Sequence, residues 1–218
     1  MNLLSRGNEK IGNDIYAFNL PAVTTCPGMS SACACCCYAQ RGRWLFPNVQ
    51  RALAWNLRIA QQPHFVDEVV EEVRRRQVRV LRIRASGDFF DEPYTRKWAD
   101  VLDLSPRVKA YAYTRSWRIP DMRMALEELA TLRNFRLWYS ADRDTGIPTD
   151  VPDGVRISWL QLDANDPVPD GVHLVFRNHP IRRIPQQRIG LAVVCPTERG
   201  RKHSKTCTTC GICWRAPT

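Results

Sequence analysis

Short apolar runs recur along the chain, and most of them are bounded by turn-forming residues. Between Val78 and Ile83 the apolar side chains are interspersed with arginines, and an alternating pattern of this kind is typical of a strand. The other runs are rich in Val, Ile, Leu and aromatic residues, as strands usually are. Together they predict seven strands, at residues 15–20, 78–83, 108–114, 135–140, 155–162, 172–176 and 192–195.

Between the first four of these strands the apolar residues recur every three or four positions, which is the period of a helix. Pro47 stands where a helix tolerates proline best, in the first turn. Asp121 is a good candidate for the N-cap of a later helix. The pattern predicts four helices, at 48–61, 65–76, 92–104 and 121–132, and only short loops after residue 155.

Strands and helices that alternate in this way imply parallel strands joined by right-handed crossovers. We therefore expect an α/β fold, built as a partial (β/α) barrel of about six or seven strands that is open on one side. In such folds the functional residues gather at the C-terminal ends of the strands. We place this domain at residues 1–194, followed at 195–218 by a cysteine-rich extension that binds a cluster.

Polar residues follow three of the predicted strands. After strand 78–83, a glycine lets a backbone approach a ligand closely, and an aspartate supplies a hydrogen-bond acceptor. The next two strands end in hydroxyl, guanidinium and carboxylate groups, and a guanidinium suits a carboxylate ligand by its two-pronged geometry. The candidate cofactor-binding residues are Ser86, Gly87, Asp88, Thr114, Arg115, Ser140 and Asp142.

The composition limits the class of protein. In 218 residues, 44% are hydrophobic and 25% are charged, which is ordinary for a soluble globular domain. No apolar run reaches the ~18 residues of a membrane helix, and the N-terminus does not resemble a signal peptide. We therefore expect a cytoplasmic protein without a membrane partner. Its net charge of +10 favours a polyanionic partner such as nucleic acid, although a generally basic surface is the alternative.

Five of the nine cysteines lie between residues 26 and 37. In a reducing compartment such a group is read as a metal site. Three thiolates can hold a 4Fe-4S cluster on three irons and leave the fourth iron open, and Cys26, Cys33 and Cys37 provide that number. Cys36 can stand in for Cys37 as the third ligand. A structural zinc is the other alternative, but it needs a fourth ligand.

A second group of four cysteines follows the last strand. Cys207, Cys210 and Cys213 form a C-x2-C-x2-C run, and Cys195 precedes a proline. This arrangement is typical of a fully ligated ferredoxin cluster. We predict a second 4Fe-4S cluster here, with a four-cysteine zinc site as the alternative.

The first cysteine motif resembles a known family. Its features are Thr25-Cys26-Pro27-Gly28, Cys33, Cys37-Tyr38-Ala39, Gly42-Arg43-Trp44, Pro47-Asn48-Val49 and Asn56. They are similar to those of small phage-encoded iron–sulfur proteins related to the radical S-adenosylmethionine enzymes. The likeness covers about the first quarter of the chain, and the extra Cys35 and Cys36 depart from the pattern.

The resemblance implies a catalytic role for the cluster at Cys26, Cys33 and Cys37. In that superfamily the reduced cluster cleaves S-adenosylmethionine and yields a 5′-deoxyadenosyl radical, with electrons from a donor such as flavodoxin or ferredoxin. Ser86, Gly87 and Asp88 match the place where relatives hold the methionyl amino group. The residues after the next two strands would then meet the carboxylate and the ribose.

Some phage relatives of this kind remodel thymine in viral DNA. The resemblance therefore implies a radical isomerase that rearranges glycyl-thymidine in phage DNA, in the cytoplasm of an infected host cell. Acting on a base in a duplex requires extruding it from the stack. The alternatives are a non-catalytic, metal-stabilised DNA-binding protein and a radical enzyme that acts on a peptide or a small metabolite.

Overall fold

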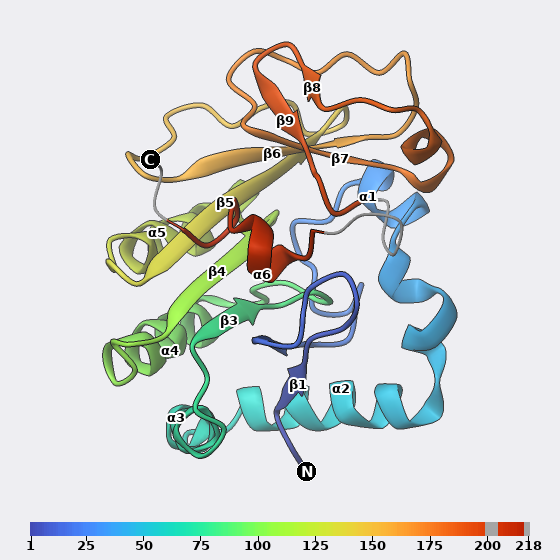
Figure 1. The fold of residues 1–218 in the computed structure, drawn as a ribbon. Helices are drawn as coiled ribbons and strands as arrows, with labels where there is room; N and C mark the ends of the chain where they lie inside the picture. Colours follow the sequence, from blue (N-terminus) through green and yellow to red (C-terminus); the bar gives the residue numbers. More distant parts are fainter. Residues whose placement is uncertain (199–204, 216–218) are drawn as a thin grey trace.

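A single nine-stranded sheet forms the centre of the molecule (Figure 1). The computed structural model describes residues 1–198 and 205–215. Seven strands pair in parallel and follow chain order from β2 to β9, while β1 and β8 pair antiparallel at the two edges. The strands are β1 (Leu4–Arg6), β2 (Ile15–Phe18), β3 (Val80–Ile83), β4 (Lys109–Thr114), β5 (Phe135–Asp142), β6 (Arg156–Gln161), β7 (Leu174–Arg177), β8 (Arg188–Ile189) and β9 (Ala192–Val194).

The α/β class is confirmed, and all seven predicted strands are present as the parallel strands. The sequence pattern does not predict β1 and β8, because strands of three and two residues are too short to show an alternation. The sheet has nine strands rather than six or seven, and β1 and β8 are its edges. The two edges do not pair with each other, so the described residues form an open sheet and do not show the predicted partial (β/α) barrel.

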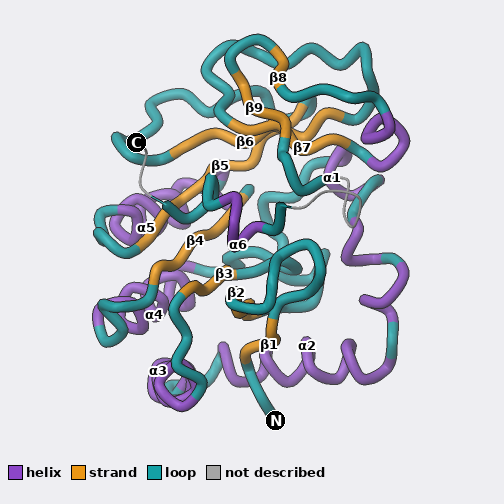
Figure 2. Tube along the Cα trace, in the orientation of Figure 1, coloured by secondary structure: helices purple, strands orange, loops and turns teal. Residues whose placement is uncertain are grey.

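Four helices of eleven or more residues accompany the first half of the sheet (Figure 2). They match the predicted helices within two residues at each end. The predicted N-cap at Asp121 is wrong. Ile119 occupies that position, Pro120 begins the helix, and Asp121 lies in the first turn. The helices are α2 (Pro47–Ala60), α3 (Phe65–Arg75), α4 (Glu92–Asp103) and α5 (Pro120–Ala130), with short helical turns α1 (Ser31–Cys35), η1 (Tyr38–Gln40), η2 (Gly42–Leu45), η3 (Ser116–Arg118), η4 (His179–Arg183) and α6 (Cys207–Cys210).

Helices α3, α4 and α5 lie side by side on one face of the sheet (Figure 1). Right-handed crossovers between parallel strands that follow chain order place all the connecting helices on the same face of the sheet. The main core lies between this face and the helices, where the Trp98 ring meets the rings of Phe18 and Phe65 edge to face, with each pair of centroids 5.3 Å apart. Edge-to-face contact is a favoured arrangement of aromatic rings.

The opposite face, which we call the inner face, carries Val80, Arg82, Tyr111, Tyr113 and Trp138. The last described segment of the chain, residues 205–215, packs on it with α6 (Figure 1).

Two backbone hydrogen bonds join this last segment to the N-terminal turn. The amides of Cys207 and Thr208 donate to the carbonyls of Lys10 and Ile11, each over 3.1 Å. Segments from opposite ends of the sequence are therefore held together across the inner face. In residues 1–198 and 205–215, no helix is long and apolar enough to cross a membrane.

Candidate metal and cofactor site

The first cysteine loop, residues 19–47, docks on the ends of β3 and β4. The Thr25 carbonyl accepts a hydrogen bond from the Asp88 amide over 2.9 Å. A side chain at Gly28 would collide with the carbonyl of Arg115, so only glycine allows the two backbones to approach so closely. The Thr-Cys-Pro-Gly start of the motif therefore fixes the loop to the sheet.

Ser86 and Gly87 hold this loop in place. The Ser86 hydroxyl donates to the Leu20 carbonyl over 2.8 Å. Gly87 has a positive φ of 75°, and a Cβ there would lie 2.5 Å from Oγ1 of Thr25. The close approach predicted at Gly87 is thus made by the chain itself.

Helix α1 presents the middle of the cysteine loop. Its N-cap is Ser30, whose hydroxyl accepts from the Cys33 amide over 3.0 Å. The thiols of Cys35 and Cys36 both donate to the Ala32 carbonyl, over 3.2 and 3.3 Å. These two thiols thus have partners within the turn.

Cys26, Cys33 and Cys37 come within electrostatic range of one another. Burial, together with the Asp88 carboxylate and the Cys33 and Cys37 thiols, raises the pKa of Cys26 to about 12. Burial also raises the pKa of Cys33, against a lowering effect of the Arg115 guanidinium. A bound metal supplies the positive charge that such thiols need in order to ionise. Within the described ranges, no three His, Cys, Asp or Glu side chains already stand at metal-binding distance.

The carboxylate of Asp88 ties the ends of β3 and β4 together. It accepts hydrogen bonds from the Thr114 hydroxyl (2.7 Å), the Arg115 amide (2.8 Å) and the Phe89 amide (2.7 Å). Asp88 and Thr114 are both buried. The predicted group at these strand ends is therefore contiguous, and its polar atoms are largely engaged with one another.

A buried ion pair links the end of β5 to the cysteine loop. Nη1 of Arg115 lies 2.6 Å from Oδ2 of Asp142, and the Ser30 hydroxyl donates to the same oxygen over 2.6 Å. The Arg115 guanidinium also lies close enough to the thiol of Cys33 to lower its pKa. Asp142, Arg115 and Cys33 thus form a continuous polar chain.

Asp144 is an anchor that the sequence analysis does not single out. Its carboxylate accepts from the Ala32 amide, in the first turn of α1, over 2.6 Å. The acidic run at residues 142–144 is the only sequence signal for it. Ser140 is half-buried, its hydroxyl lies 3.3 Å from that of Ser158, and its carbonyl accepts from the indole of the core residue Trp117.

The second cysteine group gathers on the inner face. Burial and the nearby thiols of Cys195 and Cys207 together raise the pKa of Cys213 to about 12. Burial and the same two thiols also raise the pKa of Cys210. The Thr197 hydroxyl lies 3.4 Å from Sγ of Cys195 and 3.6 Å from Sγ of Cys207. All four predicted thiols are therefore neighbours.

The sheet holds this group through β4 and β5. The Tyr113 hydroxyl donates to Sγ of Cys213 over 2.8 Å, and the Trp138 indole donates to the Cys213 carbonyl over 3.0 Å. Four thiols on the inner face of a sheet, with hydroxyl donors among them, fit a site that closes all the coordination positions of a metal or cluster.

Arg82 is a further cation on the inner face that the sequence analysis does not single out. Its guanidinium lies 5.9 Å from the centre of the Tyr113 ring and lowers the pKa of Cys213. Burial lowers the pKa of Arg82, but the hydroxyl of Tyr38, the residue that follows Cys37, and the Cys207 thiol act to raise it. Arg82 thus lies between the two cysteine groups, and it forms no ion pair with a carboxylate of the described residues.

A buried pair that the sequence pattern does not reveal supports Cys195. Nε of Arg177, at the end of β7, donates to Oε1 of Glu198 over 2.7 Å, and Nη2 donates to the same oxygen. Both side chains are almost fully buried. Because Glu198 follows Cys195 by three residues, the pair fixes the segment that carries that thiol.

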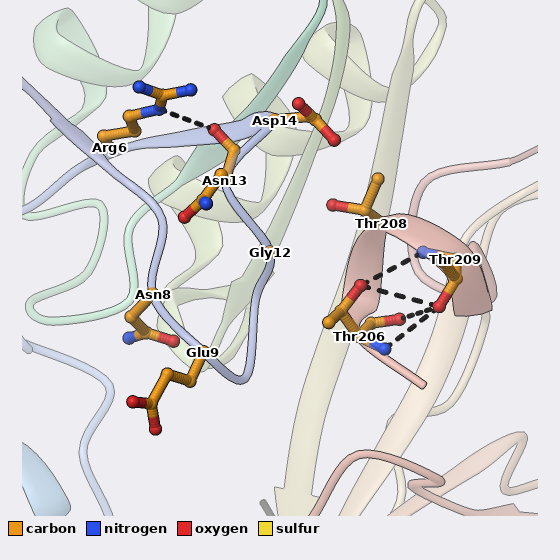
Figure 3. A pocket seen from close by; sticks show the side chains of 9 residues that line it. All are labelled: Arg6, Asn8, Glu9, Gly12, Asn13, Asp14, Thr206, Thr208 and Thr209. Carbon is orange, nitrogen blue, oxygen red and sulfur yellow. Dashed lines mark hydrogen bonds between the residues drawn. The ribbon is translucent and has the colours of Figure 1, made fainter. Parts of the chain in front are cut away.

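A cavity of about 550 Å³ lies apart from the predicted site residues. It separates the N-terminal turn, with Glu9 and Asp14, from the threonines of the last segment (Figure 3). The hydroxyls of Thr206 and Thr209 are bonded within their own turn, in a capping box. The cavity contains no cysteine, so it carries none of the predicted chemistry.

The comparisons with known proteins connect the chain to phages. The family described as Gene product 88 matches residues 2–216. The "Gene 88 protein" of Mycobacterium phage L5 is 25% identical over 205 residues, covering 87% of this chain and 77% of the relative. The "Gene 88 protein" of Mycobacterium phage D29 is 28% identical over 206 residues, covering 87% and 78%. No solved structure shows significant similarity.

Proposed function

The chain belongs to the Gene product 88 family, and on that premise we propose a function from its own residues: a radical S-adenosylmethionine enzyme that isomerises glycyl-thymidine in phage DNA. The two phage relatives bear only a gene number as a name. The observation that carries the proposal is the gathering of Cys26, Cys33 and Cys37, each on a different part of one loop, at the C-terminal ends of parallel strands. Active sites of related α/β folds lie at this end.

The donor set suits a cluster with an open iron. Three thiols are near one another, while Cys35 and Cys36 are engaged with Ala32, which supports Cys37 as the third ligand. When bound, such a cluster and S-adenosylmethionine together supply one-electron cleavage of the sulfonium and hence a carbon radical that abstracts hydrogen.

The protein's own residues position this loop. Arg115 lies near the Cys33 thiol and is itself held by Asp142, while Asp88 and Thr114 fix the backbone from which Arg115 projects. These positioning groups are themselves buried. We propose that S-adenosylmethionine binds beside these residues. It would contact the half-buried Ser140, and it would replace some of the present hydrogen-bond partners of Asp88 and Arg115.

We assign the second cysteine group to another 4Fe-4S cluster, with zinc as the alternative. Its four neighbouring thiols, Cys195, Cys207, Cys210 and Cys213, leave no coordination position open. The partly buried cation of Arg82 near them would balance the net negative charge that four thiolates give to either metal centre. Electrons would come from a donor such as flavodoxin or ferredoxin in the host cytoplasm.

The net charge of +10 supports DNA as the substrate, since arginine and lysine contacts to phosphate supply much of the affinity for nucleic acid. A second candidate, a non-catalytic DNA-binding protein stabilised by metal, is favoured by one observation. The segment with the second cysteine group fills the inner face of the sheet with packed side chains, as a purely structural centre would.

Anaerobic reconstitution with iron and sulfide separates the two functions. On reduction in the presence of S-adenosylmethionine, the enzyme forms 5′-deoxyadenosine, which chromatography detects. We expect Cys26→Ala to abolish this product, and Cys35→Ala, the matched control in the same loop, to retain it. Product formation that survives Cys26→Ala, or no product from protein with a spectroscopically intact cluster, would contradict the proposal.

A further inference from the structure

Residues 15–66 are the longest stretch of the chain without a carboxylate side chain. The stretch includes the whole first cysteine loop and four arginines, at positions 41, 43, 51 and 58. All four arginines are exposed. No carboxylate within this stretch therefore offsets the charge of its four arginines.

Exposed apolar side chains lie among these arginines. Tyr38 is 52% exposed, Leu45 58% and Phe46 53%. We call residues 38–51 the aromatic arm; Figure 1 shows it at the edge of the molecule, between α1 and α2. An exposed cluster of large apolar residues in a soluble domain commonly marks an interaction surface.

The aromatic arm is fastened to the first cysteine loop and to the sheet. Nη2 of Arg41 donates to the Cys35 carbonyl over 2.8 Å, and the Tyr38 hydroxyl donates to the Ala85 carbonyl, just after β3. The rings of Tyr38 and Trp44 lie 6.1 Å apart at their centres. The start of the aromatic arm, at Tyr38 and Arg41, therefore has a defined position next to the first cysteine loop.

We propose that the aromatic arm binds single-stranded or unpaired nucleic acid, with Arg43 and Arg51 on phosphates and Phe46 stacked on a base. Arginines and an exposed ring are the two components of surfaces that hold unpaired nucleotides. A ring can stack on a base only when the base is outside a duplex, which is also the state that base chemistry requires. The inference deepens the proposed function, because it gives the substrate a surface beside Cys37.

The test measures fluorescence anisotropy of a labelled mixed-sequence oligonucleotide, alone and as a duplex, over a series of salt concentrations. We expect the single strand to bind more tightly than the duplex. The double variant Arg43→Gln/Arg51→Gln should reduce the slope of log affinity against log salt by about 1.4, at ~0.7 per lost phosphate contact. Phe46→Ala should weaken binding of the single strand about tenfold.

The matched control is Arg74→Gln/Arg79→Gln, which removes the same charge. Arg74 is exposed at the end of α3 and Arg79 is exposed before β3, at the opposite end of the strands from the cysteine loop. An equal effect of the control would overturn the inference, as would an unchanged affinity of Phe46→Ala. Binding to phosphatidylcholine–phosphatidylserine vesicles with no affinity for the oligonucleotide at low salt would also overturn it.

These measurements need no cluster and no S-adenosylmethionine. Binding without formation of 5′-deoxyadenosine would support the aromatic arm and contradict the radical chemistry. Formation of 5′-deoxyadenosine without binding of the oligonucleotide would support the radical chemistry and contradict the role of the aromatic arm.

Discussion

Asp142 shows how much a single buried side chain does at the end of a strand. It has no exposed surface, and one of its oxygens meets both the Arg115 guanidinium and the Ser30 hydroxyl. Its other oxygen accepts from the amides of Asp144 and Thr145. The carboxylate therefore holds α1, the end of β5 and the loop after β4 in one arrangement.

We predict that Asp142→Asn costs about 3–5 kcal/mol of unfolding free energy, because it leaves the Arg115 cation buried without a counter-charge. Urea denaturation of the metal-free protein measures it. Asp144→Asn is the matched control: it removes a carboxylate that holds the same helix by one hydrogen bond to an amide, so its cost should be about 1 kcal/mol. Equal costs for the two variants would show that the ion pair contributes nothing of its own.

The residues of the candidate site could be located from the sequence, but their partners could not. Asp88, Arg115 and Asp142 are each placed by the end of a predicted strand. That the Asp88 oxygens are taken up by Thr114 and by backbone amides depends on the register between β3 and β4, which sequence pattern does not give. Arg82 looks like any other residue of an alternating strand until the last segment of the chain is placed over it.

The elements were predictable where they are long and periodic. The four helices each carry a clear apolar period, and the seven parallel strands lie in short apolar runs. The order of the parallel strands follows from the alternation of strands with helices in the first half of the chain. The edge strands β1 and β8 could not be predicted, since each forms only because a neighbouring strand offers it free backbone hydrogen-bonding groups. The pair of Arg177 and Glu198 was also hidden, because charged residues are ordinarily read as exposed.

The end of β7 supports the second cysteine group through the buried pair of Arg177 and Glu198. We predict that Glu198→Gln alone destabilises the protein by about 3–5 kcal/mol, because Arg177 stays buried and loses its counter-charge. The double variant Arg177→Met/Glu198→Leu should recover much of the loss, since it leaves no buried charge. Thermal or urea unfolding of the three proteins measures this, and a double variant that is less stable than the single one would refute it.

The molecule as a whole is closed by its last segment. Residues 205–215 cover the inner face and are bonded to the N-terminal turn through Lys10 and Ile11. The stability of the complete fold should therefore depend on whatever holds that segment together. If four thiolates bind a metal there, binding free energy becomes folding free energy.

We predict that Cys210→Ser lowers the metal content of the purified protein and reduces its melting temperature by at least ~5 °C, at ~2–4 °C per kcal/mol for a chain of this size. Cys35→Ser, in the other cysteine group but outside the predicted ligand set, should change neither. Calorimetry and metal analysis on the same samples provide the readout. A normal metal content in Cys210→Ser would remove this residue from the ligand set.

The bonds between the N-terminal turn and α6 also set an order of events during synthesis. The seven parallel strands can add to the sheet one after another as the nascent chain leaves the ribosome, since each later one pairs with the parallel strand before it. The inner face has to wait, because residues 205–215, which cover it, follow every strand of the sheet in the chain. A metal held by Cys207, Cys210 and Cys213 can therefore enter only after all the strands of the sheet have been translated.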